Sequence, residues 1–209
     1  MNRLLEQYIL DIISPESDIL EEVFRETHRR VVNPNMVSGH LQGSFLTMLI
    51  RMTKPLNVLE IGTYTGYSAI CIASALAEGA TLHTIERNDE LEELSSAFIK
   101  KSGYGERIKM YTGDARDIIP TIEGDFDIVF IDGDKREYVE YYSLVIDRIK
   151  EGGFILADNV LWDGKVLEDD VSDPMTRGIK SFNELIRDDT RVENSIVPIR
   201  DGLMIIRKI

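Results

Sequence analysis

The stretch NVLEIGTYTGYSAICIASALAEG, residues 57–79, decides the fold. Residues 57–62 form a short apolar run that is typical of a buried strand, and residues 66–79 are typical of a helix that ends at a glycine. Gly62 and Gly66 lie where the strand turns into the helix. A strand followed at once by a helix is the first part of a βαβ unit, and this predicts a parallel sheet.

Strands and helices continue to alternate after this stretch. We expect strands over 81–87, 107–113, 126–132 and 153–158, and helices over 89–103, 114–122, 135–150 and 179–189. The polar segment 163–172 reads as a surface loop. The last residues form two strands joined at Arg200-Asp201-Gly202, which predicts a hairpin and an antiparallel strand at the end of the sheet. The pattern favours an α/β fold with helices on both faces of a mostly parallel sheet.

Residues 1–53 have helical periodicity instead. Apolar residues recur at helical spacing in three segments, around 4–12, 19–27 and 41–52. Ser14-Pro15 resembles an N-cap followed by a proline in the first turn, and the sequence NPN at 33–35 interrupts the second helix. We expect one domain over 1–209, in which helices 1–53 pack on an α/β core formed by 54–209.

Charge and composition exclude several classes of partner. The formal net charge is -13, which repels nucleic acid and anionic membranes, so we expect neither as a partner. No segment approaches the roughly 20 apolar residues of a membrane span. The N-terminus lacks the continuous apolar core of a signal peptide, and the lone Cys71 can form no internal disulfide. These features predict a cytoplasmic protein.

The glycine-containing turn at 60–66 could hold a nucleotide. The dinucleotide fingerprint G-x-G-x-x-G is absent, and Glu60 would repel a pyrophosphate, so a ligand with a cationic or zwitterionic end fits better. Glu86 ends the next strand, where an acid can accept hydrogen bonds from a ribose. Asp114 and Ala115 follow the third strand and could flank an adenine ring. The alternative is that Gly62 and Gly66 serve only as a turn and a helix-packing contact.

Two apolar strands end in acidic residues. DIVFIDGDK (127–135) ends its strand at Asp132, and FILADNVLW (154–162) ends its strand at Asp158, followed by Asn159. Ligands of open parallel sheets bind beyond the carboxyl ends of the strands, so we expect the three side chains to gather there. Their oxygen atoms suit a hard divalent cation such as Mg²⁺. The absence of a histidine or cysteine pair argues against zinc.

Lys135 follows Asp132 by three residues, a spacing that returns its amine to the same side of a helical turn. Such an amine could accept or share the proton of a metal-bound hydroxyl. The alternative is that Asp132, Asp134 and Lys135 form a solvated helix cap with a surface salt bridge.

Together these motifs resemble the cation-dependent O-methyltransferases that use S-adenosylmethionine (SAM), a family that includes catechol and caffeoyl-coenzyme A O-methyltransferases. VLEIGTYTGYSA (58–69) resembles the first cofactor motif of that family, FIDGDK (130–135) resembles F-[IV]-D-A-D-K, and ADNVLWDG (157–164) resembles D-N-x-L-x-x-G. The resemblance runs from about Val31 to the C-terminus. It departs from the family pattern at Gly133, where alanine is common.

The resemblance implies a Rossmann-like class I methyltransferase fold with a seven-stranded sheet, an antiparallel C-terminal strand and an N-terminal helical extension that shapes the acceptor pocket. It implies Asp132, Asp158 and Asn159 as ligands of Mg²⁺ (or Mn²⁺ or Ca²⁺), Lys135 as general base, Asp132 as a link between metal and cofactor, and Trp162 as a wall of the substrate pocket. It also implies a homodimer. The SAM-binding residues that we expect are Val37, Glu60, Gly62, Thr63, Ser68, Glu86, Asp114, Ala115 and Asp132.

The expected reaction is transfer of a methyl group from SAM to one hydroxyl of a catechol-like phenolic small molecule. A free phenol has a pKa near 10. A cation that binds two vicinal hydroxyls lowers the pKa of the attacking one and orients its oxygen. The alternatives are a nicotinamide-dependent oxidoreductase and a non-catalytic cofactor-binding protein on the same fold.

Overall fold

The computed structural model describes residues 3–168 and 172–209. Its strands form a seven-stranded sheet in the order β3-β2-β1-β4-β5-β7-β6. Pairs β1–β4, β4–β5 and β2–β3 are parallel, whereas β7 pairs antiparallel with both β5 and β6. The predicted mostly parallel sheet with an antiparallel C-terminal strand is therefore confirmed. The strands are β1 (Asn57–Ile61), β2 (Thr81–Glu86), β3 (Ile108–Thr112), β4 (Phe126–Ile131), β5 (Ile149–Ala157), β6 (Val192–Val197) and β7 (Leu203–Lys208).

Contacts divide the chain into two compact units. The first unit contains Met1–Leu56 and Thr63–Thr112, and the second contains Asn57–Gly62 and Gly113–Ile209. The organisation as one domain stays a prediction. Within the described residues, no helix combines the length and the apolar composition that crossing a membrane requires.

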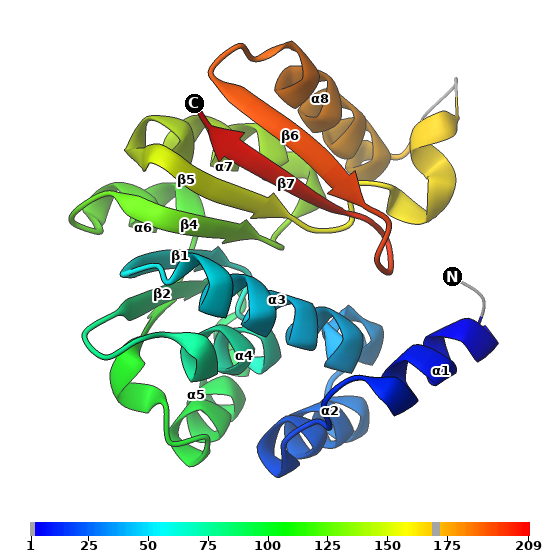
Figure 1. The fold of residues 1–209 in the computed structure, drawn as a ribbon, viewed down its shortest axis with the longest axis vertical. Coiled ribbons are helices and arrows are strands. Elements are labelled where there is room, and N and C mark those ends of the chain that lie inside the picture. The colour runs from blue at the N-terminus through cyan, green and yellow to red at the C-terminus, as the bar shows by residue number, and fades with distance from the viewer. Residues whose placement is uncertain (1–2, 169–171) are drawn as a thin grey trace. The chain divides into compact units, whose positions relative to one another are not determined.

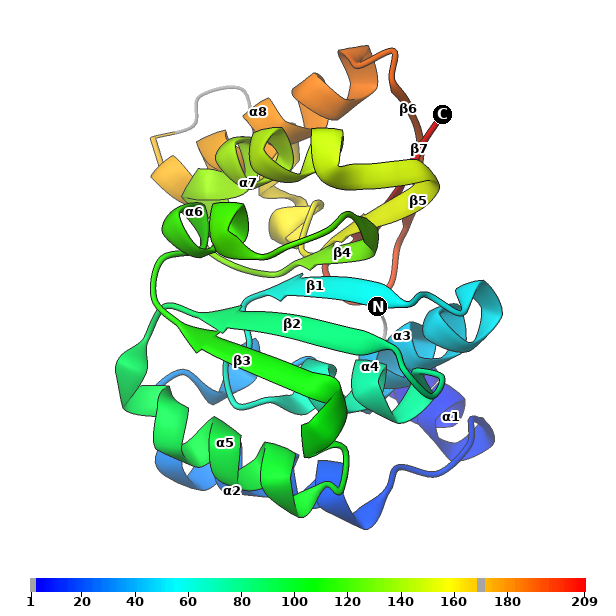
Figure 2. The ribbon, with the colours of Figure 1, turned by 90° about the vertical axis from the view of Figure 1, so that its left-hand side faces the viewer.

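In the first unit, helices pack on β2 and β3. Helix α4 contacts β2 and α5 contacts β3, while α3 packs on α4 (Figures 1 and 2). The expected cap at Ser14-Pro15 is wrong: α2 starts at Asp18 with Ser17 as its N-cap, and the backbone carbonyl of Ser14 is hydrogen-bonded to His40 Nε2 at 2.9 Å. The helices are α1 (Arg3–Ile12), α2 (Asp18–Arg30), α3 (Gly39–Thr53), α4 (Tyr67–Ala75) and α5 (Glu92–Lys101).

In the second unit, α6 (Ala115–Ile118), α7 (Tyr138–Val145) and α8 (Pro174–Asp188) lie on the same face of β4 and β5, as Figure 2 shows. Phe126 and Phe130 on β4, Tyr138 on α7 and Phe182 on α8 are fully buried, and the rings of Tyr138 and Phe182 pack edge-on. The rigid packing of strands and helices here holds the ends of β4 and β5 in place.

Several element boundaries differ from the prediction. Strand β5 starts at Ile149, and α8 starts at Pro174 because Asp173 caps it by accepting hydrogen bonds from the backbone N–H groups of Met175 and Thr176. The predicted loop 163–172 contains 3₁₀ turns over Trp162–Leu167, and residues 169–171 lie outside the described ranges. The other 3₁₀ turns are Pro34–Met36, Asp89–Leu91, Gly105–Arg107, Ile119–Thr121, Lys135–Glu137 and Ile146–Arg148.

Candidate functional site

The ends of β4 and β5 bring Asp132 and Asp158 together. The two strands run parallel with Ile131 opposite Ala157, so the next residue of each strand is an aspartate. The backbone N–H of Asp158 donates to the carbonyl of Ile131 at 3.0 Å, which fixes the two strand ends side by side. The Asp158 residue is only 4% exposed. Two carboxylates thus lie at adjacent strand ends, where the sequence predicts them.

Lys135 forms a buried ion pair with Asp132. Its Nζ lies 2.7 Å from Asp132 Oδ1, and the two side chains are 10% and 16% exposed. The alternative was a solvated helix cap formed by Asp132, Asp134 and Lys135. In the structure Asp134 is the residue that caps, at the start of the 3₁₀ turn Lys135–Glu137. Asp134 accepts hydrogen bonds from the backbone N–H of Arg136 at 3.0 Å and from its exposed guanidinium. The segment 132–136 therefore contains both a buried pair and a surface cap.

Opposing effects set the protonation of Lys135. Burial acts to lower the pKa of its amine, but the negative charges of Asp132 and Asp158 and the nearby Tyr138 raise it, and the net effect is upward. The ion pair therefore favours the ammonium form, whose positive charge compensates carboxylates that would be costly to bury alone.

Tyr138 is a member of this cluster that the sequence analysis missed. It is fully buried, and its hydroxyl accepts a hydrogen bond from Lys135 Nζ at 2.8 Å. The same hydroxyl lies 3.2 Å from the carbonyl of Ile131 and 3.1 Å from that of Asp158. Burial raises the pKa of the Tyr138 phenol. The available signal was the spacing of Lys135 and Tyr138, three residues apart on a helical turn.

The backbone after Asp158 adopts left-handed conformations. Asn159 has φ +59° and Trp162 has φ +47°, values that are uncommon for residues other than glycine. Asparagine tolerates this region better than most residues, whereas tryptophan is held there by its surroundings. Such conformations cluster at ligand-binding sites, which makes this loop a candidate for function.

The turn between β6 and β7 holds that loop. The carbonyls of Gly202 and Asp201 accept hydrogen bonds from Val160 N at 3.1 Å and Leu161 N at 2.9 Å. A Cβ at Gly202 would overlap the Leu161 side chain, so only glycine permits this approach. The predicted hairpin therefore supports the loop that carries Asn159, a role that the sequence did not suggest.

Gly62 lies directly against Asp132. It has φ +106°, and a Cβ at this position would overlap the backbone carbonyl oxygen of Asp132. The backbone N–H of Asp132 donates to the Ile61 carbonyl at 2.8 Å. Glu60, on β1, is fully buried. Gly62 is thus required by a close approach to the backbone at the end of β4, which differs from the helix-packing contact of the alternative.

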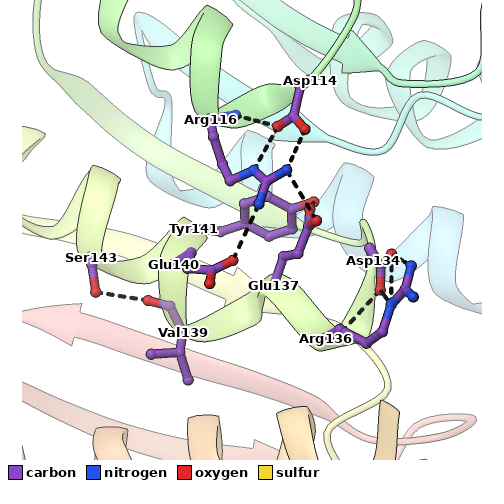
Figure 3. A network of polar contacts seen from close by, with 9 residues as sticks. All are labelled: Asp114, Arg116, Asp134, Arg136, Glu137, Val139, Glu140, Tyr141 and Ser143. Atoms are coloured by element: carbon purple, nitrogen blue, oxygen red, sulfur yellow. Dashed lines mark hydrogen bonds and ion pairs between the residues drawn. The ribbon is translucent and has the colours of Figure 1, made fainter. Parts of the chain in front are cut away.

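Asp114 caps α6 and anchors a polar network, which Figure 3 shows. Its carboxylate accepts hydrogen bonds from Arg116 Nε at 2.9 Å and Nη2 at 2.6 Å. Arg116 also approaches Glu137 at 3.4 Å, and Glu137 in turn accepts a hydrogen bond from Tyr141 Oη at 2.7 Å. Ala115 is buried at the start of the helix. The network fixes the carboxylate of Asp114 at the start of α6.

In the first unit, Glu86 lies at the end of β2 with both carboxylate oxygens engaged. One oxygen accepts the backbone N–H of Tyr64 at 2.6 Å, and the other accepts that of Asn88 at 2.8 Å. Each oxygen has a further lone pair, so a hydrogen bond from a ribose hydroxyl remains chemically possible.

The other predicted residues of the first unit are buried. Thr63 Oγ1 lies 2.6 Å from Thr84 Oγ1, and the Thr63 carbonyl accepts the backbone N–H of Gly66 at 2.8 Å, which closes the turn before α4. Ser68 lies in the first turn of α4 and is 5% exposed. Val37, which follows the first 3₁₀ turn, is 3% exposed.

The oxygen atoms of Asp132, Asp158 and Asn159 are the candidate metal ligands. Among residues 3–168 and 172–209, no group of three or more His, Cys, Asp or Glu side chains could hold a metal ion. A site here would therefore combine two carboxylates with an amide, a set that suits Mg²⁺ because this ion retains several water or substrate ligands. The residues present fit such an ion.

Comparison with known proteins identifies the family. A family model described as O-methyltransferase matches residues 11–209. A catechol O-methyltransferase from Niastella koreensis is 33% identical over 197 residues, which cover 92% of this chain and 89% of the relative. Caffeoyl-CoA O-methyltransferase 1 from Arabidopsis thaliana is 32% identical over 98% of this chain and 84% of its own length.

A solved structure agrees with this result. The O-methyltransferase TomG from Streptomyces achromogenes, in complex with SAM, superposes with a TM-score of 0.92 at 26% identity, covering 98% of this chain and 96% of that one. The predicted resemblance is confirmed. The chain therefore belongs to the O-methyltransferase family and is a SAM-dependent O-methyltransferase.

Proposed function

We propose that this enzyme methylates one hydroxyl of a catechol-like acceptor and requires a divalent cation, Mg²⁺ or alternatively Mn²⁺ or Ca²⁺. The observation that carries the proposal is the cluster of Asp132, Asp158 and Lys135 at the ends of two adjacent strands. The names of the catechol and caffeoyl-CoA relatives support a vicinal dihydroxyphenyl group in the acceptor.

The proposed metal ligands are Asp132, Asp158 and Asn159. A bound divalent cation lowers the pKa of a hydroxyl that it coordinates and holds the oxygen in a fixed orientation. We propose that the protein holds two carboxylates and one amide at fixed positions. The pairing of β4 with β5 and the left-handed conformation of Asn159 support this role. Trp162, three residues farther along the same loop, is the proposed wall of the acceptor pocket.

Lys135 is the proposed general base. With Asp132 and Asp158 as its charged neighbours, its pKa is raised and the amine holds a proton. A divalent cation bound by the same carboxylates would lower the pKa of Lys135. The neutral amine could then accept the proton of the acceptor hydroxyl. Asp132 is proposed to act in catalysis as well, because it contacts the lysine and would contact the cation.

For SAM, we propose the contacts that the family resemblance implies. Glu86 would accept hydrogen bonds from the ribose, and Val37, Thr63 and Ser68 would line the cofactor. The other proposed contacts are Glu60, Gly62, Asp114, Ala115 and Asp132. Family membership and a SAM-bound neighbour favour methyl transfer over the nicotinamide-dependent and non-catalytic alternatives.

The decisive experiment is methyl transfer from labelled SAM to a panel of catechols, with Mg²⁺ and then with a chelator. Transfer should disappear on chelation and return with added metal. Asp158→Ala should reduce turnover by on the order of 10³-fold, the value of several kcal/mol of metal stabilisation. Its SAM affinity, measured by calorimetry, should stay close to that of the wild type.

The matched control is Asp125→Ala. Asp125 is an exposed aspartate at the opposite end of β4. This variant should retain metal-dependent turnover. Transfer that survives chelation would refute the metal requirement, and transfer to simple monophenols but not to catechols would refute the acceptor class.

A homodimer in the cytoplasm is a further part of the proposal. Apolar residues on α1 are exposed, with Leu4 at 81%, Tyr8 at 64% and Ile12 at 68%. An exposed apolar stripe of this kind is typical of an association surface. Light scattering should give the mass of two chains, and replacing Tyr8 and Ile12 with glutamate should reduce it toward that of one chain. A wild-type mass of one chain would contradict the dimer.

A further inference from the structure

The hydroxyl of Tyr138 lies among polar groups that determine its direction. It contacts Lys135 Nζ at 2.8 Å, the carbonyl of Ile131 at 3.2 Å and the carbonyl of Asp158 at 3.1 Å. Its ring is fully buried and packs edge-on against Phe182 at 5.4 Å between centroids. The side chain therefore has one well-defined position beneath the two strand ends.

Only one assignment of hydrogen-bond donors and acceptors is consistent with these contacts of the Tyr138 hydroxyl. Carbonyl oxygens only accept hydrogen bonds, so the single hydroxyl hydrogen of Tyr138 is shared between Ile131 and Asp158. The oxygen lone pairs then face Lys135, whose amine must donate. An amine carries N–H groups whether it is charged or neutral, so this orientation does not depend on the protonation of Lys135.

We propose that Tyr138 is a positioning residue that fixes the direction of the Lys135 amine toward the reacting hydroxyl. The inference rests on the proposed function of Lys135 and extends it. With one N–H directed to Tyr138 and the side chain beside Asp132, the remaining valence of Nζ has a fixed direction. Because Tyr138 also contacts the carbonyls next to Asp132 and at Asp158, it ties the amine to the two carboxylates in one rigid arrangement.

The first test is Tyr138→Phe, which removes the hydroxyl and keeps the ring. Its kcat should fall by roughly 10- to 100-fold, the range found when a hydrogen-bond partner that orients a metal ligand is removed. The KM for SAM should be unchanged, because the substitution alters orientation at the reacting end only. A change confined to KM would overturn the proposal.

Tyr142→Phe is a matched control. Tyr142 lies one turn farther along α7, is 1% exposed, packs edge-on against Phe182 and donates its hydroxyl to Asp189 Oδ2 at 2.8 Å. The Tyr142→Phe substitution removes the same hydroxyl oxygen from a similarly buried residue, whose partner is Asp189 instead of Lys135. The control should keep the wild-type kcat, and equal losses in the two variants would show that Tyr138 is merely structural.

A double mutant tests whether Tyr138 acts through Lys135. In the Lys135→Met background, Tyr138→Phe should cause no further loss of kcat, because the amine that it positions is gone. Losses that multiply would mean that Tyr138 acts by another route and would overturn the inference.

A readout without turnover separates this inference from the proposed function. Nitrogen-15 NMR of the side-chain amines should show a slowly exchanging signal for Lys135, assigned by its loss in Lys135→Met. Exchange of that signal should accelerate in Tyr138→Phe and not in Tyr142→Phe, and unchanged exchange would refute the positioning role. If the wild type proves inactive on catechols, the proposed function fails, but this measurement still decides whether Tyr138 holds the amine.

Discussion

Two acid–base pairs interleave in the sequence Asp-Gly-Asp-Lys-Arg at 132–136, and their environments differ. The side chains of Asp132 and Asp134 are similarly exposed, at 16% and 17%, but that of Lys135 is 10% exposed whereas that of Arg136 is 55% exposed. Exposed pairs contribute little to stability because water screens them, whereas a buried pair leaves a costly charge when one partner is lost. Burial of the basic partner therefore separates the candidate catalytic pair from the helix cap.

Spacing along the chain marks the same difference. The pattern Asp-x-Arg recurs at 114–116, 134–136 and 189–191, and in each case the aspartate accepts a hydrogen bond from the backbone N–H of the arginine. These pairs are local turn structures. The candidate catalytic pair instead lies three residues apart, between Asp132 at the end of β4 and Lys135 at the start of the 3₁₀ turn Lys135–Glu137, and its charged groups are 2.7 Å apart.

The largest effect on kcat should come from replacing the basic residue of the buried pair, and the matched replacement in the exposed pair provides the comparison. Lys135→Met should lower kcat by roughly 10²- to 10⁴-fold, the usual contribution of a general acid or base. Arg136→Met should leave kcat unchanged, because its guanidinium points into solvent beside the cap. Steady-state kinetics on both variants measures the contrast, and comparable losses would erase the distinction between the pairs.

Gly62→Ala should have the next largest effect, on stability. The new Cβ would overlap the Asp132 carbonyl and strain a positive φ, so the free energy of unfolding should fall by about 2–5 kcal/mol. Gly79→Ala has a similar φ of +82° but open space around it, and it should cost about 1 kcal/mol. Urea denaturation distinguishes the two, and equal losses would show that φ alone matters.

Asp134→Ala should have a smaller effect. Loss of the cap should lower the free energy of unfolding by about 1 kcal/mol. The kcat should not change, since Asp134 pairs with Arg136 whereas Lys135 pairs with Asp132. Thermal denaturation together with the methyl-transfer assay tests both statements, and a large loss of kcat would move Asp134 into the site.

The smallest effect should appear in acid, at the third Asp-x-Arg pair. Hydrogen bonds from Arg191 and, to a smaller extent, from Tyr142 lower the pKa of Asp189, although burial opposes them. A lowered folded pKa contributes stability above the unfolded value of about 3.9 and loses it as the pH falls below about 4. The wild type should therefore lose stability in this range more steeply than Asp189→Asn. Parallel acid titrations of the two would contradict this.

Much of the fold could be predicted from strand–helix periodicity, because the buried strands are short apolar runs with polar ends. The adjacency of Asp132 and Asp158 also follows from the sequence, since both end parallel strands that are consecutive in the chain. The exact boundaries of the elements could not be predicted. Ser14-Pro15 looked like a cap, but α2 starts at Asp18, and the Ser14 carbonyl is hydrogen-bonded to His40, which is distant in sequence.

The supporting residues of the site could be predicted least. Tyr138 looks like any aromatic residue on the buried face of a helix, and only the tertiary position of its hydroxyl relative to two carbonyls reveals its contacts. Glycines 62 and 202 are both near turns in the sequence, but the atoms that exclude a side chain belong to Asp132 and Leu161, far along the chain. Such constraints arise only in the folded chain.

The support of the 160–163 loop by the β6–β7 turn has a consequence for synthesis. The loop forms backbone hydrogen bonds with Asp201 and Gly202, and Asp163 N–H donates to the Asp201 side chain 38 residues later in the chain. A nascent chain that already exposes Asp132, Asp158 and Asn159 still lacks the groups that shape this loop. The loop can form these hydrogen bonds only after residues 201–202 have been synthesised and lie beside it, so the ends of β4 and β5 exist in the chain before the contacts that support the loop.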